Sequence, residues 1–172
     1  PMKLDKFTEK AQEAITGANE AAFFRGHAEV TPWHLLAAVL EQEDGLVPPL
    51  FQKMQIDPAR VRAVVAERLD AMPTQEGGQT YPSAEFRTAL QTAFTEAKGL
   101  KDQYVSTEHL LLALLKDRKA PVGEYFHSIN VGRERVLNAL KELRGGEAVV
   151  DANPEAKLQA LERFTVALTE RA

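Results

Sequence analysis

An internal repeat constrains the fold of this 172-residue chain more strongly than any other feature of its sequence. Residues 30–40, VTPWHLLAAVL, return as residues 105–115, VSTEHLLLALL, at an offset of 75 positions. The same offset gives further identities without a gap on both sides, among them Ala14 with Ala89, Ala18 with Ala93, Val47 with Val122 and Phe51 with Phe126. A gapless register that extends over several segments predicts a duplicated structural unit.

Each copy contains four segments in which apolar residues recur at helical spacing. Asp5 is expected to cap the first helix, Thr31 and Pro32 to begin the second, and Ser106 to cap the sixth. No segment shows sustained alternation of apolar and β-branched residues, so no sheet is predicted. The expected fold is all-α, with two pseudo-symmetric four-helix repeats followed by a linker and a C-terminal helical tail.

Helix-breaking residues divide the chain. Proline and glycine predict a connector at 73–82, between a first repeat at 2–72 and a second at 83–144. A Gly-Gly pair then predicts a flexible linker at 145–157. Residues 158–172 have apolar side chains on one helical face that finds no partner in the repeats, so we expect this segment to lead toward a further domain.

Composition and charge exclude several classes of function. The formal net charge is −4 and the basic residues are scattered among acidic ones, which argues against nucleic-acid binding. The absence of cysteine excludes disulfides, thiol catalysis and cysteine-ligated zinc. No apolar run approaches the roughly 20 residues of a membrane-spanning helix, and no signal-peptide core is recognisable. We therefore expect no membrane partner and a cytoplasmic location.

No motif for catalysis, cofactors or metals is recognisable. The sequence lacks G-x-x-x-x-G-K-[ST], G-x-S-x-G and H-E-x-x-H. No two of its four histidines are four residues apart, which argues against a helical metal site. His34 and His109 are equivalent residues, each three positions after its helix cap. A structural role that fixes the helix start is favoured over a role as metal ligand or pH sensor.

The two copies differ at the second helical position, where Trp33 is equivalent to Glu108. A side chain at this position tends to be exposed. An exposed tryptophan is a suitable anchor for an apolar ligand, and Glu108 beside a helix N-terminus can accept a peptide N–H. The alternative is that Trp33 packs on the first helix and Glu108 only interacts with the helix dipole.

Several motifs together resemble a known family. The repeats T-P-x-H-L-L and S-T-E-H-L-L, with the opening M-K-L-D-K-F-T-E-K-A-Q, resemble the double Clp N-terminal domain. Residues 144–147, RGGE, and 158–169, LQALERFTVALT, resemble the segment that joins this domain to the first AAA+ ATPase module in the ClpB disaggregase family. The resemblance extends over nearly the whole chain and suggests an N-domain with its linker.

The resemblance implies a function and a site. ClpB-type proteins are homohexameric, ATP-driven disaggregases that work with the DnaK chaperone system, and ATP and Mg²⁺ would belong to ATPase modules outside this chain. Their N-domain engages unfolded or aggregated client polypeptides and performs no chemistry of its own. Family N-domains use a threonine, an aspartate and a glutamate, which match Thr8, Asp102 and Glu108. With Tyr104 and Trp33, these residues form the predicted client-binding site.

Competing functions remain open. An N-domain of the ClpA or ClpC type would dock adaptor proteins that feed a protease, but the C-terminal segment argues against this. A stand-alone helical regulator would leave the apolar face of 158–172 without a partner. An enzyme is the weakest alternative because no catalytic constellation is recognisable.

Overall fold

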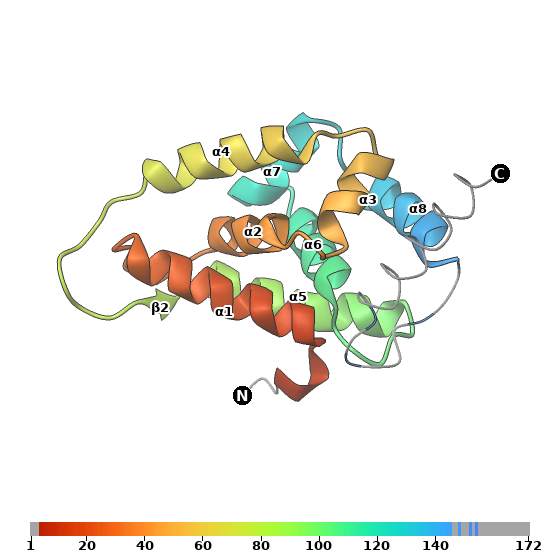
Figure 1. The fold of residues 1–172 in the computed structure, drawn as a ribbon, viewed down its shortest axis with the longest axis horizontal. Coiled ribbons are helices and arrows are strands. Elements are labelled where there is room, and N and C mark those ends of the chain that lie inside the picture. The colour runs from red at the N-terminus through yellow and green to blue at the C-terminus, as the bar shows by residue number, and fades with distance from the viewer. Residues whose placement is uncertain (1–3, 146–147, 149–151, 153, 155–172) are drawn as a thin grey trace, which may run out of the picture.

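The computed structural model describes residues 4–145, 148, 152 and 154, and these residues form a helical fold (Figure 1). The first repeat contains a short 3-10 helix η1 (Leu4–Lys6), followed by α1 (Glu9–Phe24), α2 (Pro32–Glu41), α3 (Val47–Lys53) and α4 (Pro58–Asp70). The second contains α5 (Ala84–Gly99), α6 (Thr107–Lys116), α7 (Pro121–Ser128) and α8 (Arg133–Arg144). The prediction of an all-α fold with two four-helix repeats is confirmed.

The helix boundaries reproduce the offset found in the sequence. Helices α5 and α6 begin and end 75 residues after α1 and α2, and α8 begins 75 residues after α4. The backbone repeats as well: Gln55 after α3 and Asn130 after α7 both adopt positive φ, at 60° and 62°. The duplicated unit is therefore structural and extends to individual backbone conformations.

Short extended segments of the two repeats pair with each other. Strand β1 (Glu29–Val30), before α2, pairs in parallel with β2 (Tyr81–Pro82), before α5. The equivalent pairing is a parallel bridge between Phe7, before α1, and Val105, before α6. Each repeat thus contributes one entry segment, the extended residues just before a helix, to each pairing. The two pairings hold the repeats in a pseudo-two-fold arrangement.

The prediction that the chain forms no sheet is wrong at this point. The residues that precede capped helices are extended, and their backbone groups need hydrogen-bond partners outside the helix. They find them across the repeat: the N–H groups of Thr8 and Ser83 donate to the carbonyls of Val105 and Val30, both at 2.9 Å. Strands of two residues are too short to produce the alternating pattern that identifies a sheet in sequence.

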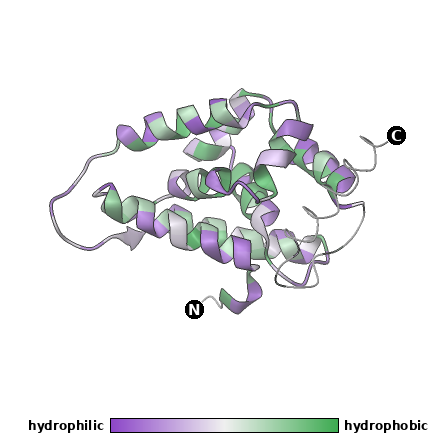
Figure 2. Cartoon of the chain, viewed as in Figure 1, coloured by the Kyte–Doolittle hydropathy of each residue, from purple (hydrophilic) through white to green (hydrophobic). Residues whose placement is uncertain are grey.

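Helices α2 and α6 form the centre of the fold (Figure 1), and the ribbon coloured by hydropathy shows hydrophobic residues along both (Figure 2). Helix α2 contacts α1, α4, α5 and α6, and α6 contacts α1, α5, α7 and α8. In α6 every residue from Thr107 to Leu115 is buried, and from Leu110 onward all of these side chains are apolar around the whole circumference of the helix. None of the helices within the described ranges is long and apolar enough to cross a membrane.

The predicted linker at 145–157 is described only at residues 145, 148, 152 and 154, and the predicted tail at 158–172 lies outside the described residues. The carbonyl of Ala152 accepts a hydrogen bond from the N–H of Glu9 at 2.8 Å, which places residue 152 beside the start of α1. The domain boundaries inferred from sequence stay predictions.

Candidate functional site

A histidine completes the start of α2 and of α6. The backbone N–H of Thr31 donates to Nδ1 of His34 at 2.9 Å, and that of Ser106 donates to Nδ1 of His109 at 2.8 Å. Because Nδ1 is an acceptor in both rings, the ring proton lies on Nε2. Both sites are capping boxes in which the histidine takes the place of the usual glutamate. The structural role predicted for His34 and His109 is confirmed.

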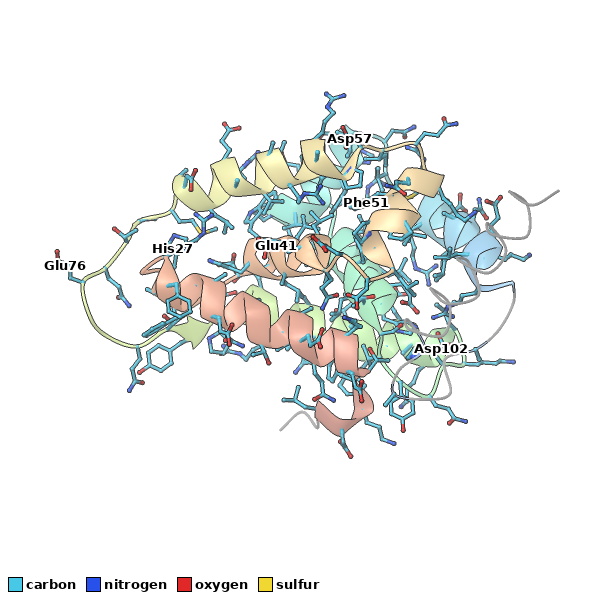
Figure 3. The ribbon with its side chains drawn as sticks, viewed as in Figure 1. His27, Glu41, Phe51, Asp57, Glu76 and Asp102 are labelled. Carbon is cyan, nitrogen blue, oxygen red and sulfur yellow. The ribbon has the colours of Figure 1, made fainter. Side chains whose placement is uncertain are left out.

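The Nε2–H groups of the two histidines have different partners. His34 Nε2 lies 2.8 Å from Nδ1 of His27, and both rings are buried. His109 Nε2 donates to Oδ2 of Asp102 at 2.6 Å. His27 and Asp102 follow α1 and α5 at equivalent positions and lie at opposite ends of the molecule (Figure 3). Burial lowers the pKa of His34 to about 4, so its ring is neutral at pH 7.

Arg144 of α8 connects Asp102 to Glu108. Its Nη1 lies 2.9 Å from Oδ2 of Asp102, and its Nη2 donates to Oε1 of Glu108. Burial acts to raise the pKa of Glu108, but the charge of Arg144 and the hydrogen bond from its guanidinium lower it on balance. Glu108 is therefore ionised at neutral pH. Among the described residues, its second oxygen Oε2 has no hydrogen-bond partner.

Thr8 and the α5–α6 loop meet at one corner of the fold. The hydroxyl of Thr8 accepts a hydrogen bond from Ala11 N–H at 3.1 Å, so Thr8 caps α1 and the expected cap, Asp5, lies in η1 instead. Thr8 N–H donates to the carbonyl of Val105, which follows the half-buried Tyr104. The structure thus brings Thr8, Asp102, Tyr104 and Glu108 together, as the family resemblance implies.

The expectation that Trp33 and Glu108 are exposed is wrong. Glu108 is fully buried because Arg144 of α8 pairs with it. Trp33 is only 6% exposed because α4 and α7 cover it: the guanidinium of Arg68 lies 5.3 Å from the indole centroid, and the ring of Tyr125 lies 6.2 Å away. Trp33 therefore packs on α4 and α7 rather than on α1. Sequence periodicity predicts which side of a helix a residue lies on, but it does not predict which other helices cover that side.

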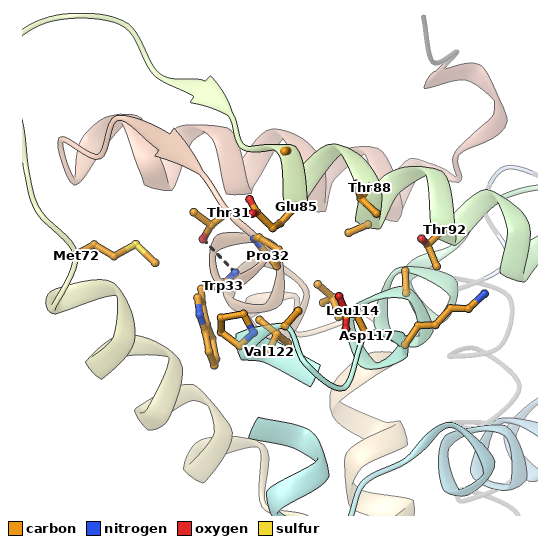
Figure 4. Close-up of a pocket in the computed structure, with 16 residues that line it drawn as sticks. Thr31, Pro32, Trp33, Met72, Glu85, Thr88, Thr92, Leu114, Asp117 and Val122 are labelled. Atoms are coloured by element: carbon orange, nitrogen blue, oxygen red, sulfur yellow. Dashed lines mark hydrogen bonds between the residues drawn. The ribbon is translucent and has the colours of Figure 1, made fainter. Parts of the chain in front are cut away.

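A groove of about 700 Å³ runs along α5, opposite the start of α2, the end of α6 and the start of α7 (Figure 4). Its surface is mostly apolar and includes Pro32, Trp33, Met72, Ala89, Leu114 and Val122. Polar side chains at its margin come from two helix segments and comprise Glu85, Thr88, Thr92, Lys116 and Asp117. Trp33 is the one predicted site residue that lines it, so Trp33 was the only signal in the sequence for this groove.

The groove along α5 offers a binding surface. Within the described residues, no group of three or more histidine, aspartate or glutamate side chains is arranged to hold a metal ion. The groove presents apolar side chains with a few polar groups at the margin, which is the composition of a ligand-binding cleft.

Residues 6–129 match the sequence family described as the Clp repeat N-terminal domain. The chain belongs to the Clp N-terminal domain family. Over 172 residues this Clp N-domain is 37% identical to the chaperone protein ClpB of Rhodopirellula baltica, a match that covers 99% of this chain and 19% of that protein. The chain spans about a fifth of the length of the curated ClpB relatives that it matches.

Solved structures share the fold of this Clp N-domain. The Hsp104 N-terminal domain from Candida albicans is 25% identical, has a TM-score of 0.74, and the match covers 86% of this chain and 97% of that one. A ClpV N-domain in complex with a VipB peptide is 17% identical, has a TM-score of 0.68, and the match covers 86% of this chain and 96% of that one. The sequence resemblance to ClpB-type N-domains is therefore confirmed.

Proposed function

We propose that this Clp N-domain binds extended polypeptide segments in the groove along α5 and presents them to the ATP-driven chaperone of which it forms a part. The groove is the observation that supports this proposal. Its volume of about 700 Å³ lies within the range of about 300–1,000 Å³ that is usual for ligand pockets, which is room for several side chains of an extended chain. Unfolded and aggregated polypeptides expose the apolar segments that such a surface would bind.

Sequence relatives and a structural neighbour also support this proposal. The curated relatives are chaperones, and the ClpV N-domain was solved with a peptide bound. By extension, we propose that the clients are unfolded or aggregated polypeptides, that the complete protein is a homohexamer, and that it works with the DnaK system in the cytoplasm. In this proposal the domain itself catalyses no reaction and needs no cofactor, while ATP and Mg²⁺ act elsewhere in the complete protein.

The proposed contacts differ among the predicted residues. Trp33 forms part of the groove wall and is proposed to contact the client directly. The client-binding role of Thr8, Asp102, Tyr104 and Glu108 stays a prediction. Because Thr8, Asp102 and Glu108 are buried in caps and ion pairs, a client at their corner would first meet the half-buried Tyr104.

A blocking substitution tests the groove. Thr88 is an exposed groove residue in the second turn of α5, so Thr88→Trp would fill the groove without removing core packing. Gln91 is exposed on the same helix and does not line the groove, so Gln91→Trp adds the same bulk elsewhere. Binding of a permanently unfolded client, without ATP, is followed by NMR chemical shifts.

We expect Thr88→Trp to weaken binding about tenfold, since loss of one apolar contact region is worth about 1–2 kcal/mol, and Gln91→Trp to leave it unchanged. Equal binding by both variants would assign client capture to another surface. Binding only to a protease adaptor protein, and not to the unfolded client, would favour the ClpA/ClpC-type function instead.

A further inference from the structure

In the first repeat, side-chain contacts join α1 to the segment after α2 at the place equivalent to the groove margin. The residues equivalent to Glu85 and Asp117 are Lys10 on α1 and Gln42 after α2. The Nε2 group of Gln42 donates to the backbone carbonyl of Lys10 at 2.9 Å. Nζ of Lys10 lies 2.7 Å from Oδ1 of Asp44, in the loop before α3. These two contacts join the start of α1 to the end of α2 across the position where a groove would lie.

The same contacts are absent from the second repeat because its residues differ. Glu85 and Asp117 are both acidic and exposed, and Lys119 stands where the first repeat has Asp44. Within the described residues, no hydrogen bond or ion pair joins Glu85 to Asp117 or to Lys119; Oδ1 of Asp117 instead accepts the backbone N–H of Lys119 at 3.0 Å. Asp117 is a carboxylate without an N–H group, so it cannot repeat the hydrogen bond that Gln42 donates to the carbonyl of Lys10, and the groove of the second repeat is open at this place.

The margin of the open groove is negatively charged. Glu85 lies in the first turn of α5 and Asp117 at the end of α6, on opposite walls (Figure 4). Lys116 also lines the groove, but its Nζ lies 3.9 Å from Oε1 of Glu96 and is turned toward that carboxylate. Glu96 is itself paired with Arg133 at 2.7 Å. The charged side chains that line the groove are therefore two carboxylates and one ammonium group, and the ammonium group is turned toward Glu96.

From this arrangement we infer that the groove selects polypeptide segments in which lysine or arginine lies next to apolar residues. The apolar floor binds the apolar side chains, and Glu85 and Asp117 pair with the flanking cations. Segments with acidic flanks bind more weakly because their carboxylates face two others. This inference rests on the proposed function of the groove and specifies the class of segment that it binds.

Two peptides with the same apolar centre test the inference, one flanked by lysine and the other by glutamate. Their affinities for the 172-residue chain are measured by titration calorimetry at low and high salt. We expect the lysine-flanked peptide to bind roughly fivefold more tightly at low salt and the difference to shrink at high salt, because exposed ion pairs are weak and screened. Equal affinity would overturn the inference while the groove keeps its function. Failure of both peptides to bind would overturn the proposed function itself.

A charge-neutral variant and a matched control locate the effect. Glu85→Gln with Asp117→Asn keeps side-chain shape and should abolish the preference between the two peptides. Glu67→Gln with Glu134→Gln removes the same charge from exposed positions outside the groove and should keep the preference. If both double variants keep the preference, the selectivity does not come from the groove carboxylates and the inference fails.

Transplanting the residues that make these contacts tests the comparison between the repeats. Glu85→Lys, Asp117→Gln and Lys119→Asp together give the second repeat the residues that join α1 to the segment after α2 in the first. We expect this triple variant to remain folded, as judged by circular dichroism, and to bind both peptides at least tenfold more weakly. Unchanged binding of the lysine-flanked peptide by the folded variant would contradict the inferred roles of these residues.

Discussion

Nε2 of His34 lies 2.8 Å from Nδ1 of His27, with both rings buried in the first repeat. Burial is the main reason that the pKa of each ring is lowered, and the charge of Arg25 adds to the effect. Since Nδ1 of His34 accepts the Thr31 N–H, a second proton on His34 would have to displace the cap of α2. The start of α2 is therefore sensitive to acid.

Stability should fall between pH 6.5 and about pH 4. The pKa of His34 is about 4 in the folded chain and near 6.5 when unfolded, so the unfolded state binds more protons in this range. The stabilisation is present above pH 6.5 and is lost as the pH falls toward 4, and it amounts to about 3 kcal/mol. Urea unfolding at several pH values measures the loss, and NMR titration of the His34 ring measures its pKa. A His34 ring that titrates near 6.5 in the folded protein would contradict this prediction.

Replacing Glu108 by alanine should lower stability and separate structure from binding. The change leaves Arg144 with Asp102 as its remaining ion-pair partner, so we expect a cost of about 1–3 kcal/mol in the free energy of unfolding. Binding of an unfolded client is then compared at a temperature where circular dichroism shows both proteins to be folded. Unchanged binding by the folded variant would remove Glu108 from the client-binding site.

Thr8→Ser should preserve stability, whereas Thr8→Val should reduce it by about 1 kcal/mol. Serine retains the hydroxyl that accepts the Ala11 N–H, and valine keeps the shape without the acceptor. Thermal unfolding of the two variants measures the cap, and client titration of each measures binding. If both variants lose client binding while only Thr8→Val loses stability, Thr8 has a role beyond its cap.

Gly123→Ala should be among the more damaging small substitutions. A Cβ atom at Gly123 would lie 2.0 Å from the carbonyl oxygen of Asp117, a backbone atom that cannot move aside. We expect a loss of about 3 kcal/mol and a disturbed groove margin, because α7 would be forced away from the end of α6. Gly99→Ala, where nothing lies within 4 Å of the added atom, is the control and should change stability by no more than about 1 kcal/mol. Similar unfolding curves for the two variants would refute the close approach at Gly123.

Most of the fold could be predicted from local information. Apolar spacing gave the helices, and the 75-residue register gave the repeats, since both depend on residues that are near neighbours along one helix or at one fixed offset. The capping histidines were also predictable, because Thr31 with His34 and Ser106 with His109 act within a single helical turn. The parallel pairing of the entry segments was not, because it joins residues about 50 to 100 positions apart.

The candidate site was only partly predictable. Trp33 and Glu108 were identified as the point where the copies differ, but their exposure depends on Arg68, Tyr125 and Arg144, which other helices supply. The family resemblance grouped Thr8, Asp102 and Glu108, and the backbone pairing of Thr8 with Val105 shows how they come together.

The sequence by itself determined that the chain is a duplicated helical domain, because the helical spacing of apolar residues and the 75-residue register are properties of the residue order alone. Only the tertiary structure decided that a groove lies along α5 and that a hydrogen bond spans the equivalent place in the first repeat. The side chain of Gln42 donates to the backbone carbonyl of Lys10 on another helix, and the equivalent Asp117 has no N–H group with which to make this bond. A hydrogen bond of this kind can form only after packing has placed the two groups opposite each other, and that placement depends on the fold as a whole.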